Sequence, residues 1–148
     1  MIGIEYKVNH ATIIDICSHL EKCNAFYQPP LEKSVNIFDY SKKIAENSIT
    51  FEAWHEGILV SLLAAYFNDI TSQRGFITNV STLSEFGRLG LAKNLLNKCI
   101  LYAFEHGFDE LDLEVSIQNL KAIALYQTFE FKRTELRGSS VLMKRKIK

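Results

Sequence analysis

The stretch Glu85-Phe-Gly-Arg-Leu-Gly-Leu-Ala-Lys-Asn-Leu-Leu96 decides the fold of this chain, because its pattern is that of a turn that leaves a strand and opens a helix. The residues before it, Gly75–Leu83, are rich in β-branched and aromatic side chains, which favour a strand. After it, apolar residues recur at helical spacing from Leu91 to Ala103. Gly87 and Gly90 keep the junction free of bulky side chains, so the first backbone N–H groups of the helix stand clear.

This turn is a candidate phosphate cradle. A helix start concentrates unpaired N–H donors and partial positive charge, which together favour an anion. Arg88 and Lys93 flank the turn and supply charge-assisted contacts to phosphate oxygens. Plain strand-to-helix packing is the alternative interpretation. The Gly-x-Gly-x-x-Gly spacing of a dinucleotide site and the Gly-Lys-Ser/Thr of a nucleotide P-loop are both absent from the sequence.

Length and charge restrict the class of protein. The 148 residues suit one domain over 1–148 with a buried core of its own. Lys plus Arg and Asp plus Glu number 17 each, so no net field attracts nucleic acid or an anionic membrane. The basic cluster 144–148 is interpreted as a solvated strand end. No apolar run approaches the ~18 residues of a membrane helix, and no signal peptide is apparent, so we expect a cytoplasmic protein.

Cysteines and histidines indicate neither a disulfide framework nor a metal site. The three cysteines are odd in number and form no C-x-x-C pair. The four histidines are scattered, make no H-x-x-x-H motif and are not expected to pair with a cysteine. We therefore expect no bound metal, and each histidine is interpreted as a surface or partly buried residue.

The predicted elements follow the order β-α-α-β-β-β-α-β-α-β-β, which makes a mixed α/β domain. Asn9, Asn36 and Asn119 are the predicted N-caps of the first, second and fourth helices. Pro29-Pro30 makes 24–31 an extended loop, whose Phe26 and Tyr27 are either a lid over a pocket or simple packing. The predicted strands are 2–8, 48–55, 58–67, 75–83, 110–115, 131–136 and 140–147, and the helices end near 22, 46, 107 and 129.

A second feature lies downstream, where Val115-Ser-Ile-Gln-Asn119 ends a strand and caps a helix, and Tyr126 lies seven residues beyond the cap. Together with the Gly90-x-Ala92 turn and the element order, this resembles the GCN5-related N-acetyltransferase (GNAT) family. The resemblance covers nearly the whole chain and is sharpest over 75–131. It implies a central mixed, mostly antiparallel sheet, flanked by about four helices and splayed between its fourth and fifth strands.

The resemblance also implies acetyl-coenzyme A (acetyl-CoA) as co-substrate, with its pyrophosphate on the turn and its pantetheine arm along the preceding strand. Tyr126 matches a tyrosine that family members often use as the general acid; a buried helical aromatic with a bonded hydroxyl is the other interpretation. The positions carried over for coenzyme binding are Val80, Ser81, Thr82, Leu83, Phe86, Gly87, Arg88, Leu89, Gly90, Leu91, Ala92, Lys93, Asn119 and Tyr126.

Four positions depart from the family pattern. Gly87 occupies the leading Gln/Arg position of the turn, and Arg88 comes one residue late. Ser84 stands where a proline is usual. Glu130 stands where the family commonly has a glycine with a special backbone angle, which implies either strain or a different turn.

The general base is not assigned by the sequence. Family members often carry a glutamate on the strand before the turn, but this strand holds no carboxylate. Glu52, His55, Asp69 and Glu114 are candidates by residue type alone. A water relay through Asn79 or Ser81 is the alternative.

The function implied by the resemblance is acyl-CoA-dependent N-acetyl transfer to a primary amine by direct attack. The expected acceptor is a small amine, such as an amino sugar or an amino acid derivative, and a protein N-terminus or lysine is the alternative. Phe26, Tyr27, Tyr66 and Asn79 are the candidate acceptor contacts. Homodimers are common in the family. Two other hypotheses are a non-catalytic coenzyme-A-binding module that regulates or binds a partner, and an α/β domain without coenzyme.

Overall fold

One seven-stranded sheet, in the order β1-β2-β3-β4-β5-β7-β6, organises the computed structural model, which describes residues 3–27 and 29–147. The predictions that touch Ile2, Gln28 and Lys148 lie outside the described residues. The strands are β1 (Glu5–Val8), β2 (Ile49–His55), β3 (Ile58–Asp69), β4 (Arg74–Thr82), β5 (Glu110–Ser116), β6 (Lys132–Arg137) and β7 (Ser140–Lys146). The helices are α1 (Ile13–Cys23), α2 (Ile37–Asn47), α3 (Leu91–Glu105) and α4 (Leu120–Thr128), with 3₁₀ turns η1 (Asn24–Phe26), η2 (Leu31–Lys33) and η3 (Ser84–Phe86).

The predicted order of helices and strands is confirmed, and so is the mixed, mostly antiparallel sheet. The loop 24–31, predicted to be extended, instead contains η1 and the start of η2. No helix among the described residues is both long enough and apolar enough to cross a membrane.

Helix caps account for where the helices begin. Asn36 and Asn119 cap α2 and α4 as predicted, each accepting a bond from a backbone N–H three residues on. The prediction that Asn9 caps α1 was wrong. Thr12 is the cap, in a capping box with Asp15, and the Asn9 side chain instead accepts from Thr50 N–H of β2 at 2.9 Å.

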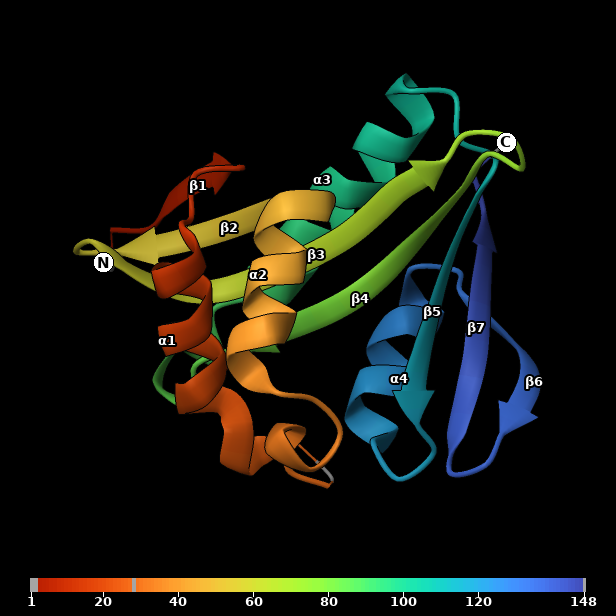
Figure 1. The fold of residues 1–148 in the computed structure, drawn as a ribbon. Helices are drawn as coiled ribbons and strands as arrows, with labels where there is room; N and C mark the ends of the chain where they lie inside the picture. The colour runs from red at the N-terminus through yellow and green to blue at the C-terminus, as the bar shows by residue number, and fades with distance from the viewer. Residues whose placement is uncertain (1–2, 28, 148) are drawn as a thin grey trace.

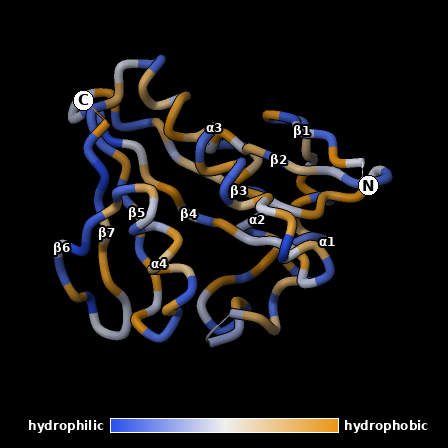
Figure 2. The backbone as a smooth tube through the Cα atoms, turned by 180° about the vertical axis from the view of Figure 1, so that it is seen from behind, coloured by the Kyte–Doolittle hydropathy of each residue, from blue (hydrophilic) through white to orange (hydrophobic). Residues whose placement is uncertain are grey.

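The sheet is covered on both faces. Helices α1 and α2 lie on one face, where their apolar side chains pack against alternate residues of β3 such as Leu62 and Ala64 (Figure 1). Helices α3 and α4 lie on the other face (Figure 2), where α3 packs against β3 in the apolar cluster that includes Leu63 and Ala65. Strand β3 is therefore buried on both faces from Leu59 to Ala65, which explains its nearly continuous apolar run.

A β-bulge in β4 changes which face its side chains meet. Ala64 of β3 pairs with Asn79, but its neighbour Ala65 pairs with Ile77, so Thr78 is the extra residue. The bulge puts Ile77 on the α3 face and turns Asn79 and Ser81 toward the α1 face, although these three residues are two apart in sequence.

Tyr40 of α2 holds this bulge in place. Its hydroxyl donates to the Thr78 carbonyl at 2.7 Å and lies 2.8 Å from Thr78 Oγ1. Burial raises the pKa of Tyr40, so the phenol remains a donor. The carbonyl that the bulge leaves without a ladder partner is therefore satisfied by a side chain.

Strands β4 and β5 form the one parallel pair of the described sheet, and they pair over four residues only. Arg74 lies opposite Glu110, and Ile77 lies opposite Leu113. Beyond this point the two strands separate, as Figure 1 shows, while β5 continues to pair with β7 along its whole length. The predicted splay between the fourth and fifth strands is confirmed.

Substituting Tyr40 tests the tie to the bulge. Tyr40→Phe removes the donor and leaves the Thr78 carbonyl unpaired, so we expect a loss of about 1 kcal/mol of unfolding free energy. In a chain of this size that lowers the melting temperature by roughly 2–4 °C. Tyr6→Phe on β1, whose hydroxyl has no bond to a described residue, is the control. Equal melting temperatures for the two variants would contradict the tie.

Glu130 allows a second test, because it takes the conformation usually left to glycine, with φ at 69°. A non-glycine residue in the left-handed conformation lowers the free energy of unfolding by roughly 1–2 kcal/mol. Glu130→Gly should therefore raise the melting temperature by a few degrees. Glu130→Ala also loses the 3.3 Å ion pair with Arg145 but keeps the strain, and it should give no rise. A rise with alanine as well would mean that the ion pair, not the backbone, is unfavourable.

Candidate active site

The gap between the separated ends of β4 and β5 holds two adjoining cavities. One, of about 730 Å³, lies against the start of α3. The other, of about 520 Å³, lies against η1 and the end of β5. After the ligands that the resemblance implies for each, we call them the coenzyme-side and the acceptor-side cavity. The residues that line both are Phe26, Val80, Ser81, Thr82, Asn119, Ala122 and Tyr126, so the two form one passage through the splay.

The coenzyme-side cavity ends at an uncapped helix start. Gly90, at φ 70°, is the N-cap of α3 and offers no side chain. The first N–H that bonds back into the helix is that of Asn94, to the Gly90 carbonyl at 3.1 Å. The N–H groups of the first helical turn therefore have no helical partner, and together with the Lys93 side chain they line a space that fits a phosphate group.

Most of the positions carried over for the coenzyme line this cavity. They are Val80, Ser81, Thr82, Phe86, Gly87, Gly90, Leu91, Ala92, Lys93, Asn119 and Tyr126. Leu83 does not, because it packs into a buried cluster with Val60 and Leu91. Arg88 and Leu89 are exposed beside the turn, outside the lining. The turn thus offers backbone N–H groups and Lys93 to an anion.

Tyr126 projects from α4 into both cavities and is 7% exposed. Its ring packs edge-on against Phe131, and its hydroxyl has no hydrogen bond to any described residue. Burial raises the pKa of Tyr126 to about 12, so the phenol keeps its proton at neutral pH. A neutral hydroxyl that faces a cavity can donate a proton to a leaving group there.

The acceptor-side cavity brings together three of the four candidate acceptor contacts, Phe26, Tyr27 and Asn79. Tyr66 lies elsewhere, in a separate hollow of about 330 Å³ at the paired end of β4 and β5. The lining of the acceptor-side cavity is mixed, because apolar residues such as Val115 alternate with polar ones such as Gln118.

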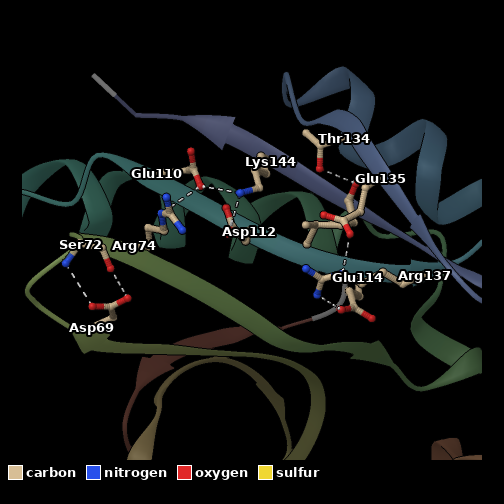
Figure 3. A network of polar contacts seen from close by, with 11 residues as sticks. Asp69, Ser72, Arg74, Glu110, Asp112, Glu114, Thr134, Glu135, Arg137 and Lys144 are labelled. Atoms are coloured by element: carbon tan, nitrogen blue, oxygen red, sulfur yellow. Dashed lines mark hydrogen bonds and ion pairs between the residues drawn. The ribbon is translucent and has the colours of Figure 1, made fainter.

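Near Tyr66 the two strands are tied by a charged cluster, drawn in Figure 3. Glu110 contacts Arg74 at 3.6 Å and Lys144 at 3.5 Å, and Lys144 also lies 3.8 Å from Asp112. Burial and the neighbouring Glu110 carboxylate raise the pKa of Asp112 to about 6. These charges lie at the closed end of the splay, away from both cavities, and their contacts join β4, β5 and β7.

Of the four base candidates, Glu114 alone lines either cavity of the passage, while Asp69 lines the separate hollow near Tyr66. Its carboxylate accepts from Arg137 at 2.8 Å (Figure 3). It also accepts from the Ser140 hydroxyl at 3.2 Å. Glu52 is fully buried beside the connection from β1 to α1, where it accepts from two backbone N–H groups, a threonine hydroxyl and the Trp54 indole. The His55 ring bonds the Gly3 carbonyl. The Asp69 carboxylate accepts from the backbone N–H and the hydroxyl of Ser72 within the β3–β4 turn.

His19 and Cys23 were misjudged from sequence. His19 is 2% exposed, although a surface or partly buried position was expected. Its Nε2 lies 3.7 Å from Cys23 Sγ one turn along α1, which corrects the expectation that no histidine pairs with a cysteine. The sequence did contain a feature that indicates this contact. His19 and Cys23 are four residues apart, on the helix face that also carries Ile16 and Leu20.

Similarity to known proteins identifies the family of this chain. The model of the "Acetyltransferase (GNAT) family" matches residues 13–131. The N-alpha-acetyltransferase MAK3 of Arabidopsis thaliana is 26% identical over 119 residues, which are 79% of this chain and 63% of that protein's length.

Solved structures of low sequence identity share the fold. The PaiA N-acetyltransferase of Thermoplasma acidophilum, in complex with coenzyme A, has a TM-score of 0.75 at 16% identity, over 98% of this chain and 99% of that one. The ribosomal-protein-S18-alanine N-acetyltransferase of Escherichia coli has a TM-score of 0.73 at 18% identity, over 97% and 94%. With four-fifths of its length matched by the family model, this chain belongs to the acetyltransferase (GNAT) family, whose co-substrate is acetyl-CoA.

Proposed function

We propose that the protein transfers the acetyl group of acetyl-CoA to the α-amine of a peptide or protein. The observation that carries the transfer is the passage itself, because it joins an uncapped helix start, a strand edge free of β5 and a protonated tyrosine in one continuous space. Acetyl-CoA supplies a thioester, whose carbonyl carbon is the electrophile.

The residues of the passage have separate tasks in this proposal. The N–H groups at the start of α3 and the Lys93 ammonium bind the phosphates. The β4 edge after Ile77 offers backbone groups to an amide-containing arm, because β5 no longer pairs with it. Holding both reactants in one passage contributes much of the rate, since it replaces a chance encounter by a fixed geometry.

Tyr126 completes the bond exchange. The amine nitrogen forms a bond to the acetyl carbon, the carbon–sulfur bond breaks, and its electron pair goes to sulfur, which takes the Tyr126 proton. The nitrogen releases one proton to water in the acceptor-side cavity, and Tyr126 regains one from water. The raised pKa of Tyr126 keeps the donor loaded across the neutral range.

Two observations favour a peptide as acceptor. The curated relative and one structural neighbour are named for acetylation of protein N-termini or of a ribosomal-protein alanine. In addition, Phe26 lines the acceptor-side cavity and is 66% exposed, and Ile117 and Leu120, which flank the lining residues Gln118 and Asn119 in the sequence, are exposed by 41% and 69%. A chain that leaves the cavity would cover such apolar side chains, whereas a small amine would leave them in water. A small amine remains the second candidate, because the cavity has room for an amino sugar.

Coenzyme binding is the first test. At a hundredfold excess over its Kd, acetyl-CoA should stabilise the protein by roughly 2.7 kcal/mol, seen as a melting-temperature rise of several degrees. Gly90→Glu should abolish that rise, because it places a negative charge at the helix start. Gly57→Glu, at φ 76° in the β2–β3 turn, carries the same strain and charge away from the cavities and should keep the rise. No rise in the native protein would refute coenzyme binding.

Turnover is the second test. Tyr126→Phe should lower kcat by about a hundredfold or more with little change in the KM for acetyl-CoA, since general acid help contributes roughly 10²–10⁴-fold. Tyr102→Phe on α3, outside both cavities, is the control and should be unaffected. An unchanged kcat for Tyr126→Phe would contradict its role.

The acceptor is identified by comparing the acetylation rates of four amines. Two are peptides: a hexapeptide with a free N-terminus, and the same hexapeptide with a blocked N-terminus and one lysine. The other two are spermidine and glucosamine. We expect the free α-amine to react fastest. Faster reaction of glucosamine would favour the small-amine alternative. Binding of acetyl-CoA without any turnover would favour a non-catalytic coenzyme-A-binding module.

A further inference from the structure

A buried polar chain runs from α1 to the wall of the acceptor-side cavity. His19 Nδ1 lies 3.0 Å from the Leu59 carbonyl, and its Nε2 lies 2.9 Å from Ser81 Oγ. Because a carbonyl only accepts, Nδ1 carries the hydrogen of the ring. Burial lowers the pKa of His19 to about 4, so the ring is neutral at pH 7 and Nε2 is an acceptor.

The chain continues through two residues of β4's bulged segment. Ser81 Oγ donates to Asn79 Oδ1 at 2.7 Å, and Asn79 Nδ2 donates to Tyr27 Oη at 2.8 Å. The Ser81 hydroxyl has one hydrogen and faces two acceptors, Asn79 Oδ1 and His19 Nε2, so it donates to one of them at a time. When it donates to Asn79, the Cys23 thiol, 3.7 Å from Nε2, is the donor to His19. Burial raises the pKa of Cys23 to about 11, so the thiol keeps its hydrogen.

The last member of the chain is the hydroxyl of Tyr27. It receives the hydrogen of Asn79 at 2.8 Å, Ser81 also lies within hydrogen-bonding reach of it, and Tyr27 lines the acceptor-side cavity. Burial raises the pKa of Tyr27 to about 12, which keeps the group neutral. Tyr126 reaches the same cavity from α4. The two phenols thus approach it from different elements.

Packing alone does not require this chain. The α1 face around His19 is apolar, with Ile16 and Leu20 fully buried, and a leucine would fill the position without the cost of burying an imidazole. Each polar atom of the chain lies within hydrogen-bonding distance of the next, and the chain ends at a cavity surface. Such a chain has an evident use, which is to fix the rotamer of the residue at its end.

We propose that Tyr27 contacts the acceptor amine and that His19 is a positioning residue, which acts on the acceptor only through Ser81, Asn79 and Tyr27. This inference rests on the proposed function. The Tyr27 hydroxyl accepts from an amine N–H or donates to the substrate backbone beside it, as a hydroxyl can do both. Its contribution belongs to acceptor binding, whereas that of Tyr126 belongs to the leaving group.

Steady-state kinetics with the free-N-terminus hexapeptide test the contact. Tyr27→Phe should raise the KM for the peptide three- to tenfold and leave that for acetyl-CoA unchanged, as expected for one lost hydrogen bond. His19→Leu should act in the same direction, and His19→Gln, which again donates and accepts, should restore part of the loss. His106→Leu, a histidine bonded only within α3, is the control.

The double variant separates positioning from general damage. If His19 acts through Tyr27, adding His19→Leu to Tyr27→Phe should raise the peptide KM no further. If the two substitutions instead multiply their separate effects on the peptide KM, the positioning role of His19 is overturned. A changed KM for acetyl-CoA, or an unchanged KM for the peptide, would overturn the contact.

Nuclear magnetic resonance of ¹⁵N-labelled histidine tests the chain without any turnover. We expect the Nδ1–H tautomer for His19 at pH 7, and a shift of its Nε2 signal when Tyr27→Phe removes the far end of the chain. An unmoved signal would refute the chain even in an active enzyme. If the native protein turns over no amine, the proposed function and the Tyr27 contact fail, while the spectrum still decides whether His19 and Tyr27 are linked.

Discussion

The parting of β4 from β5 after four residue pairs is the constraint on which the rest of the molecule depends. Strand β5 keeps its other partner, β7, over seven residues, and the charged contacts of Glu110 with Arg74 and Lys144 fasten the short parallel pair at its closed end. Past Ile77 the edge of β4 that faces β5 therefore has no strand partner among the described residues. Buried backbone groups require partners, so a ligand with amide groups fits this edge better than an apolar one. The cavities and the orientation of α3 and α4 around them follow from that gap.

The bulge at Thr78 gives the gap two chemically different sides. One extra residue in β4 inverts the alternation of its side chains, so Ile77 and Val80 pack with the α3 face while Asn79 and Ser81 meet α1. The helix-start side thus offers backbone N–H groups and a lysine, whereas the α1 side offers a chain of neutral side-chain bonds. Tyr40 links the bulge to α2, so the polar side of the cleft is supported by a helix that does not itself line it.

Most of the fold was predictable because its signals are local. The caps at Asn36 and Asn119, the Gly90 turn and the alternation of β5 each depend on a few neighbouring residues, and each is confirmed. The bulge was not predictable, because it arises from the register between β3 and β4 and leaves no mark in the β4 sequence alone. The burial of His19 likewise depends on Leu59 and Ser81, which lie 40 and 62 residues away. For the same reason Thr12 displaced Asn9 as the cap of α1, since Asn9 bonds a residue 41 positions on.

The charge state of the cleft bears on which amines can react. Burial holds Tyr27, Cys23 and Tyr126 in their neutral, protonated forms, and the Glu114 carboxylate is already paired with Arg137. A passage so lined offers little to stabilise an ammonium ion taken out of water, so in the proposed reaction the acceptor enters as the free amine. At pH 7 roughly a tenth of peptide α-amines are unprotonated, with a pKa near 7.8, against on the order of one in a thousand or fewer lysine side chains. A cleft without a strong base therefore favours an α-amine over a lysine through the acceptor's own pKa. Strand β4, which precedes the start of α3, carries no carboxylate. This composition is consistent with an α-amine acceptor, because an α-amine needs a general base less than a lysine does.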